Sequence, residues 1–161
     1  MSNMSDITPE SLIVILDSLK ADYVAVIDQL DLNTPISAAG DWNARQILSH
    51  IIGSLNRVPI HAGYYLANVS PIPITFSDPY WIEAWHDAPI QAFKAAFEAA
   101  VEGNKALVRS LPSDVFWRVL PVTSFGELPL GAFLMVNYNG HIRGQHLHHL
   151  KAFVEVAAQP A

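Results

Sequence analysis

A cluster of histidines near the end of this chain and one histidine far upstream could together bind a metal. Four of its seven histidines lie in one nine-residue window, at positions 141, 146, 148 and 149, and His50 lies far upstream. Neutral imidazole is a common ligand of divalent transition metals. A helix bundle builds a metal site in its interior by bringing such side chains together from facing helices. The first hypothesis is therefore a metal or catalytic site shared between an early and a late helix.

Two stripes compete for the inward face of the late helix, because residues three and four apart share a helix face. One stripe consists of Met135, Tyr138, Ile142, Gln145, His149, Ala152 and Val156. The other, rotated slightly, consists of Leu134, Tyr138, His141, Gln145, His148 and Ala152. Helical periodicity does not choose between them, and Gln145 belongs to both.

The candidate ligands combine His50 of the early helix with members of these two stripes. They are His50, Gln145 and His149, with His141 in the alternative register. A glutamine carbonyl is a weaker and harder ligand than imidazole for transition metals. In either stripe His146 is expected to face away from the site. The competing interpretation is a set of hydrogen-bonded core histidines that hold no metal.

Four long helices are predicted from capping signals and apolar spacing. The first runs from Pro9 to about residue 30 with Thr8 as its N-cap, and the second starts after an Asp41 cap and is interrupted by Pro59. The third opens at Pro89, and the fourth starts within residues 126–129 and runs to about residue 157. Residues 115–120 are apolar enough to form a short extended stretch. We expect an all-α, up-and-down four-helix bundle, with a long connection between helices 2 and 3, as a single domain over residues 1–161.

Composition excludes several classes of function. The chain is 51% hydrophobic and 15% charged, with a net charge of -6 and no basic run, so neither nucleic acid nor a membrane surface is an expected partner. No cysteine is present, which excludes disulfides and a cysteine nucleophile. The N-terminal residues lack the pattern of a signal peptide, so a cytoplasmic location is expected. The low charge favours a homodimer.

Two motifs carry a resemblance to a known family. The segment Asp41–Ile51 holds a tryptophan followed by a helix and His50, and the segment Gln145–Leu150 holds the late histidines. Together they resemble the DinB-like superfamily of four-helix metalloproteins, also called the damage-inducible or YfiT-like fold. The resemblance covers essentially the whole chain.

The resemblance implies a ligand set. In that family three histidines bind a divalent ion, one from the second helix and two, spaced four apart, from the last. His50 matches the first and His149 the third, whereas Gln145 stands at the second position. Moving the register by one turn pairs His141 with Gln145 instead. Three outcomes stay open: Gln145 ligates, His141 or His148 substitutes for it, or the site holds no metal.

The resemblance also implies a function. It suggests a divalent-metal enzyme, using Zn, Ni, Mn or Fe, that acts as a thiol transferase or hydrolase on a small electrophilic substrate. A low-molecular-weight thiol would have to be a co-substrate, since the chain has no cysteine. A loop with Trp81 and Trp85 would shield the site. The alternative is a non-catalytic, metal-free bundle that binds a small apolar ligand or serves as a dimeric interaction module.

Overall fold

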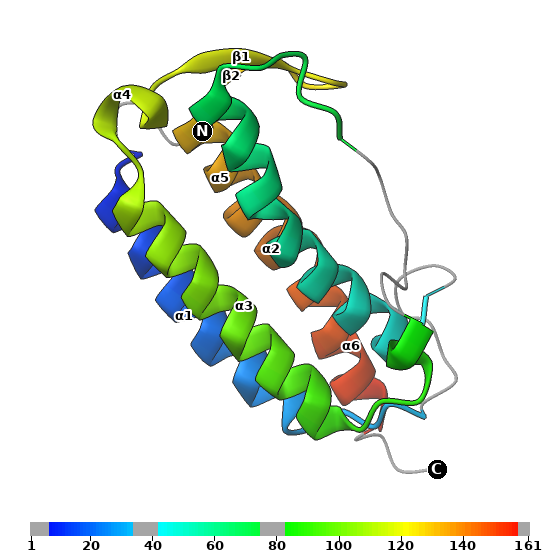
Figure 1. Cartoon of the computed structure of the whole chain (residues 1–161). Coiled ribbons are helices and arrows are strands. Elements are labelled where there is room, and N and C mark those ends of the chain that lie inside the picture. The colour runs from blue at the N-terminus through cyan, green and yellow to red at the C-terminus, as the bar shows by residue number, and fades with distance from the viewer. Residues whose placement is uncertain (1–6, 34–41, 75–82, 158–161) are drawn as a thin grey trace.

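Four long helices form the body of the described part of the chain, packed side by side as Figure 1 shows. The computed structural model describes residues 7–33, 42–74 and 83–157. Three of the helices are α1 (Pro9–Ile27), α2 (Ala44–Ala67) and α3 (Ile90–Ser110). The fourth is continuous but changes type along its length, from α5 (Leu130–Met135) through η3 (Val136–Leu147) to α6 (His148–Ala157). The predicted all-α four-helix bundle is confirmed.

Local sequence explains where the first two helices begin. The hydroxyl of Thr8 accepts a hydrogen bond from the backbone N–H of Ser11, and proline follows at the first helical position, as predicted. In α2 the N-cap is Asn43, whose side chain pairs reciprocally with Gln46. The predicted cap, Asp41, lies outside the described residues. Helix α2 continues through Pro59, and its buried side chains recur from Ala44 to Tyr65.

Neighbouring helices are not all antiparallel. Helices α1 and α3 run in opposite directions, with Lys94 paired to Asp28 at one end and Lys105 to Asp17 further along. Helices α2 and α3 run in the same direction, which Figure 1 shows by their colour order. The connection over residues 68–89 therefore starts at one end of the bundle and ends at the other. The expected long connection is present. Because it crosses the length of the bundle, it lets α2 and α3 run parallel, so the simple up-and-down order holds for only some neighbouring pairs.

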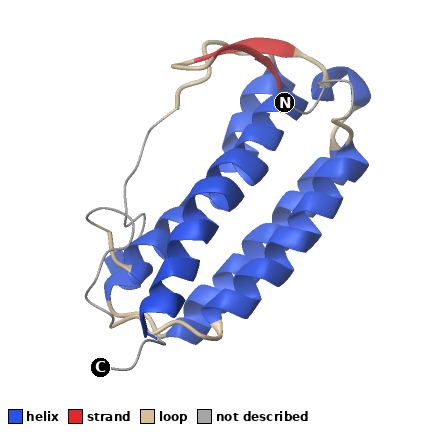
Figure 2. Cartoon of the chain, turned by 180° about the vertical axis from the view of Figure 1, so that it is seen from behind, coloured by secondary structure: helices blue, strands red, loops and turns tan. Residues whose placement is uncertain are grey.

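A two-stranded sheet covers one end of the bundle (Figure 2). Strands β1 (Val119–Val122) and β2 (Gly126–Pro129) pair antiparallel, after a single helical turn, α4 (Ser113–Phe116). The tyrosine hydroxyl of Tyr65 in α2 donates to the backbone carbonyl of Leu128 at 2.9 Å and ties the sheet to the helices. The prediction that the last helix starts within residues 126–129 is thus wrong. These residues are held extended by pairing with β1, and the helix begins only at Leu130.

The interior is filled by aromatic and aliphatic side chains from all four helices. The largest fully buried ones are Tyr23, Tyr65, Tyr138, Phe93, Phe97, Phe116 and Phe153. Within the described residues, no helix has the length and apolar character needed to span a bilayer. The site described next lies between α2 and the last helix.

Candidate metal centre

A π-helical segment decides which late histidines meet. Residues Val136–Leu147 are π-helical, so backbone bonds there run between residues five apart. His141 and His146 are five apart and consequently lie on one face of η3. In an α-helix the same face would have carried His141 and Gln145. π-Helical turns are rare in proteins, and many of those that occur lie at functional sites.

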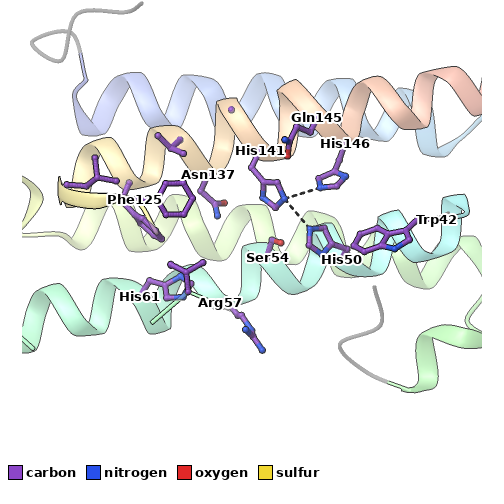
Figure 3. A pocket seen from close by; sticks show the side chains of 15 residues that line it. Trp42, His50, Ser54, Arg57, His61, Phe125, Asn137, His141, Gln145 and His146 are labelled. Atoms are coloured by element: carbon purple, nitrogen blue, oxygen red, sulfur yellow. Dashed lines mark hydrogen bonds between the residues drawn. The ribbon is translucent and has the colours of Figure 1, made fainter. Parts of the chain in front are cut away.

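Three imidazoles from two helices converge. The Nε2 atom of His141 lies 3.1 Å from Nε2 of His50 in α2 and 2.9 Å from Nε2 of His146 (Figure 3). One ring nitrogen of each residue lies within 4.8 Å of the others. This cluster of His50, His141 and His146 is called the histidine triad below.

The triad fits a metal ion better than a hydrogen-bond network. A ring nitrogen carries either one proton or one lone pair, so Nε2 of His141 cannot form two full hydrogen bonds in opposite roles. Nitrogens that bind one ion at about 2.0–2.1 Å lie about 2.9–3.4 Å apart when the angles are between 90° and tetrahedral. The two short separations fall in this range. Three converging lone pairs are the donor set that a cation would satisfy.

Burial keeps the triad in the protonation state that binds metals. His50 is 4% exposed and His146 is 8% exposed. Burial, followed by the neighbouring His50, lowers the pKa of His141 to about 4. Burial, and then the other nearby histidines, lowers the pKa of His146 to about 3. Both rings are therefore neutral near pH 7, as a metal ligand must be.

The predicted candidates fall into two groups. His50 and His141 belong to the triad. Gln145 is exposed at the edge of the same pocket, and His149 is partly exposed with its ring centroid 5.7 Å from that of His146. The expectation that His146 faces away from the site is wrong, because that expectation assumed α-helical spacing throughout.

Trp42 packs against the triad, whereas Trp85, expected to shield the site, does not. Trp42, at the start of α2, meets the His50 ring edge-on at 5.0 Å between centroids and stacks on His146 at 6.4 Å. It thus supports two members of the triad. Trp85 stacks on the core residue Phe93 and does not line the pocket, while Trp81 lies outside the described residues.

The triad opens into a pocket of about 500 Å³. One wall is a single face of α2, formed by His50, Ser54, Arg57 and His61. The opposite wall is the last helix, and Phe125 of the hairpin lies at the end away from Trp42 (Figure 3). Leu128 of the hairpin also lines the pocket. His61 shares the pocket with His50 but does not belong to the triad.

Comparison with solved structures identifies the fold. The chain superposes on YfiT from Bacillus subtilis with a TM-score of 0.76 and 17% sequence identity, over 99% of this chain and 93% of that one. The fold is that of YfiT. The resemblance to the DinB-like, YfiT-like bundle drawn from the two histidine motifs is confirmed at the level of the fold. YfiT is described as a probable metal-dependent hydrolase with an unusual four-helix bundle topology. No protein-family model matches the chain, and no curated protein matches it in sequence.

Proposed function

We propose that this chain is a divalent-metal-dependent hydrolase of a small molecule, with His50, His141 and His146 as the metal ligands. The observation that carries the proposal is the convergence of three Nε2 atoms at one end of a pocket. The description of YfiT as a probable metal-dependent hydrolase supports the same reaction class. An all-imidazole set suits Zn, Ni or Fe, and Mn is the poorest match among the four metals expected from the sequence.

Each part of the site has a role in this proposal. A divalent ion with three protein ligands and an open position supplies Lewis-acid activation of water near neutral pH. The buried imidazoles stay neutral, and Trp42 packs against two of them and restricts their rotation. The pocket beside the triad holds the substrate and limits water around the reacting bond.

Activity after metal reconstitution tests this proposal. Chelator-treated protein is loaded with one equivalent of Zn, Ni, Mn or Fe and assayed against a panel of small esters and amides. We expect hydrolysis with the loaded wild type and a loss of at least about 100-fold for His141→Ala. His148→Ala is the matched control, because its side chain is exposed on the same helix and outside the triad.

Three other outcomes would contradict the proposal. Turnover that requires an added low-molecular-weight thiol would make the protein a thiol transferase. A gain in thermal stability with metal but no turnover would indicate a binding module. No response to any metal would favour the metal-free bundle. The homodimer and the cytoplasmic location stay predictions.

A further inference from the structure

The pocket extends well beyond the histidine triad. His61 comes eleven residues after His50 on the same face of α2, which corresponds to about 16 Å of helix. Both residues line the pocket, so it is long enough for a molecule with two distinct ends. Only one of these ends meets the triad.

The far end is apolar. Phe125 lies there (Figure 3), and the ring of Phe133 meets that of His61 edge-on at 5.3 Å between centroids. Ile74 and Leu128 add apolar side chains to the pocket lining. Aromatic rings prefer such edge-to-face arrangements with other rings. This end would therefore take an aromatic or branched aliphatic group.

Two buried polar atoms along the pocket have no partner among the described residues. The side-chain oxygen of Asn137 and Nδ1 of His61 are buried and make no hydrogen bond within the described part of the chain. Both residues line the pocket, and Figure 3 shows Asn137 between Phe125 and His141. A buried polar atom left unpaired is costly, and most such atoms have a partner. A bound molecule that donates an N–H or O–H would satisfy Asn137.

The charge of the wall limits the ligand further. Arg57 is the only charged side chain among the described residues that line the pocket, and it is cationic. Burial, followed by the charge of Arg57, lowers the pKa of His61, with the backbone of Pro73 acting in the opposite direction. None of these described residues supplies a carboxylate that would attract a cationic ligand, so the described lining favours a neutral or anionic molecule.

We infer that the pocket binds a neutral carboxamide carrying an aromatic or branched apolar group. The carbonyl lies toward the triad, the amide N–H donates to Asn137, and the apolar group lies against Phe125 and Phe133. This inference deepens the proposed function, on which it rests for the identity of the reacting bond. Hydrolysis of such a molecule breaks its C–N bond, adds the hydroxyl of water to the acyl carbon and transfers the proton to the amine nitrogen.

A matched pair of probes tests the inference. N-Benzylacetamide and its ester analogue, benzyl acetate, differ in the N–H that would donate to Asn137. Dissociation constants are measured by NMR titration with wild type, Asn137→Ala and the control Asn139→Ala, an exposed asparagine on the same segment. We expect the amide to bind wild type about two- to tenfold more tightly than the ester, the range of one net hydrogen bond. Asn137→Ala should remove this preference, and Asn139→Ala should keep it.

Several results would overturn the inference. Equal binding of amide and ester to wild type would do so, as would an Asn137→Ala variant that keeps the preference or weakens both probes equally. Tighter binding of the cation benzylamine than of the amide would also contradict it.

The same titration on His50→Ala separates this inference from the proposed function. If the amide preference persists there while no metal-loaded protein hydrolyses anything, the pocket assignment stands and the hydrolase proposal fails. If hydrolysis depends on metal but the amide preference is absent, the hydrolase proposal stands and the pocket assignment fails.

Discussion

At the scale of single residues, the stability of the triad depends on whether the rings of His141 and His146 are neutral. His141 and His146 are buried against other imidazoles, so a proton on either ring would be poorly solvated and repelled. The sequence pointed to His50 and His141 because histidines facing one another across a bundle are a recognised metal arrangement. It could not point to His146, since the five-residue spacing has meaning only once the helix is known to be π-helical.

The lowered pKa values predict that metal-free protein loses stability in mild acid. The ordinary pKa is 6.5, against about 4 for His141 and about 3 for His146 in the fold. From pH 6.5 downward the unfolded chain binds more protons than the native state, so stability falls with pH until the folded pKa values are reached. Each ring should contribute about 1–2 kcal/mol of loss between pH 7 and pH 5.

Urea unfolding at the two pH values measures this effect. The double variant His141→Gln/His146→Gln lacks both titrating rings and should show a clearly shallower pH dependence. An identical dependence in the variant and in wild type would contradict the assignment.

At the scale of elements, the change of helix type within one continuous helix positions the site. Apolar spacing and capping signals predicted the helices well, because Thr8 with Pro9 and the stripe of α2 are local features. Pairing between β1 and β2 depends on contacts across a turn, so the strand over Gly126–Pro129 was mistaken for a helix start. The π-helical register of η3 likewise escaped a prediction that assumed α-helical spacing along the whole of the last helix.

Alanine substitutions at two glycines of η3 should change the free energy of unfolding differently. A Cβ at Gly140 meets no atom within 4 Å, whereas one at Gly144 would lie 3.3 Å from the backbone oxygen of Asn139. Gly140→Ala should therefore raise the free energy of unfolding by about 0.5–1 kcal/mol through the loss of unfolded-state entropy. Gly144→Ala should gain less or lose stability. Denaturant titration of both variants checks this, and a larger gain for Gly144→Ala would be inconsistent with the described backbone.

At the scale of the whole molecule, buried hydrogen bonds link all four long helices. Asn104 of α3 donates to the backbone carbonyl of Leu55 in α2 and accepts from the hydroxyl of Tyr138 in η3, at 3.0 and 2.8 Å. Tyr23 of α1 donates to the carbonyl of Ile142, the residue after His141, at 2.6 Å. Two of these bonds tie η3 to α1 and α3 and so help to set its position along the bundle axis.

Removing one hydroxyl from this chain should destabilise the whole fold. Tyr138→Phe leaves the buried side-chain oxygen of Asn104 without its donor, which costs about 1–3 kcal/mol. Urea unfolding should show a lower midpoint with an unchanged slope, since the native structure is otherwise kept. A midpoint equal to that of wild type would mean that the hydrogen bond contributes nothing measurable.

The metal content of two histidine variants tests the central claim most directly. Elemental analysis of protein purified without chelator should find about one divalent ion per chain in wild type and in His149→Ala, and none in His146→Ala. Metal retained by His146→Ala but lost from His149→Ala would contradict the π-helical triad and restore the α-helical ligand set.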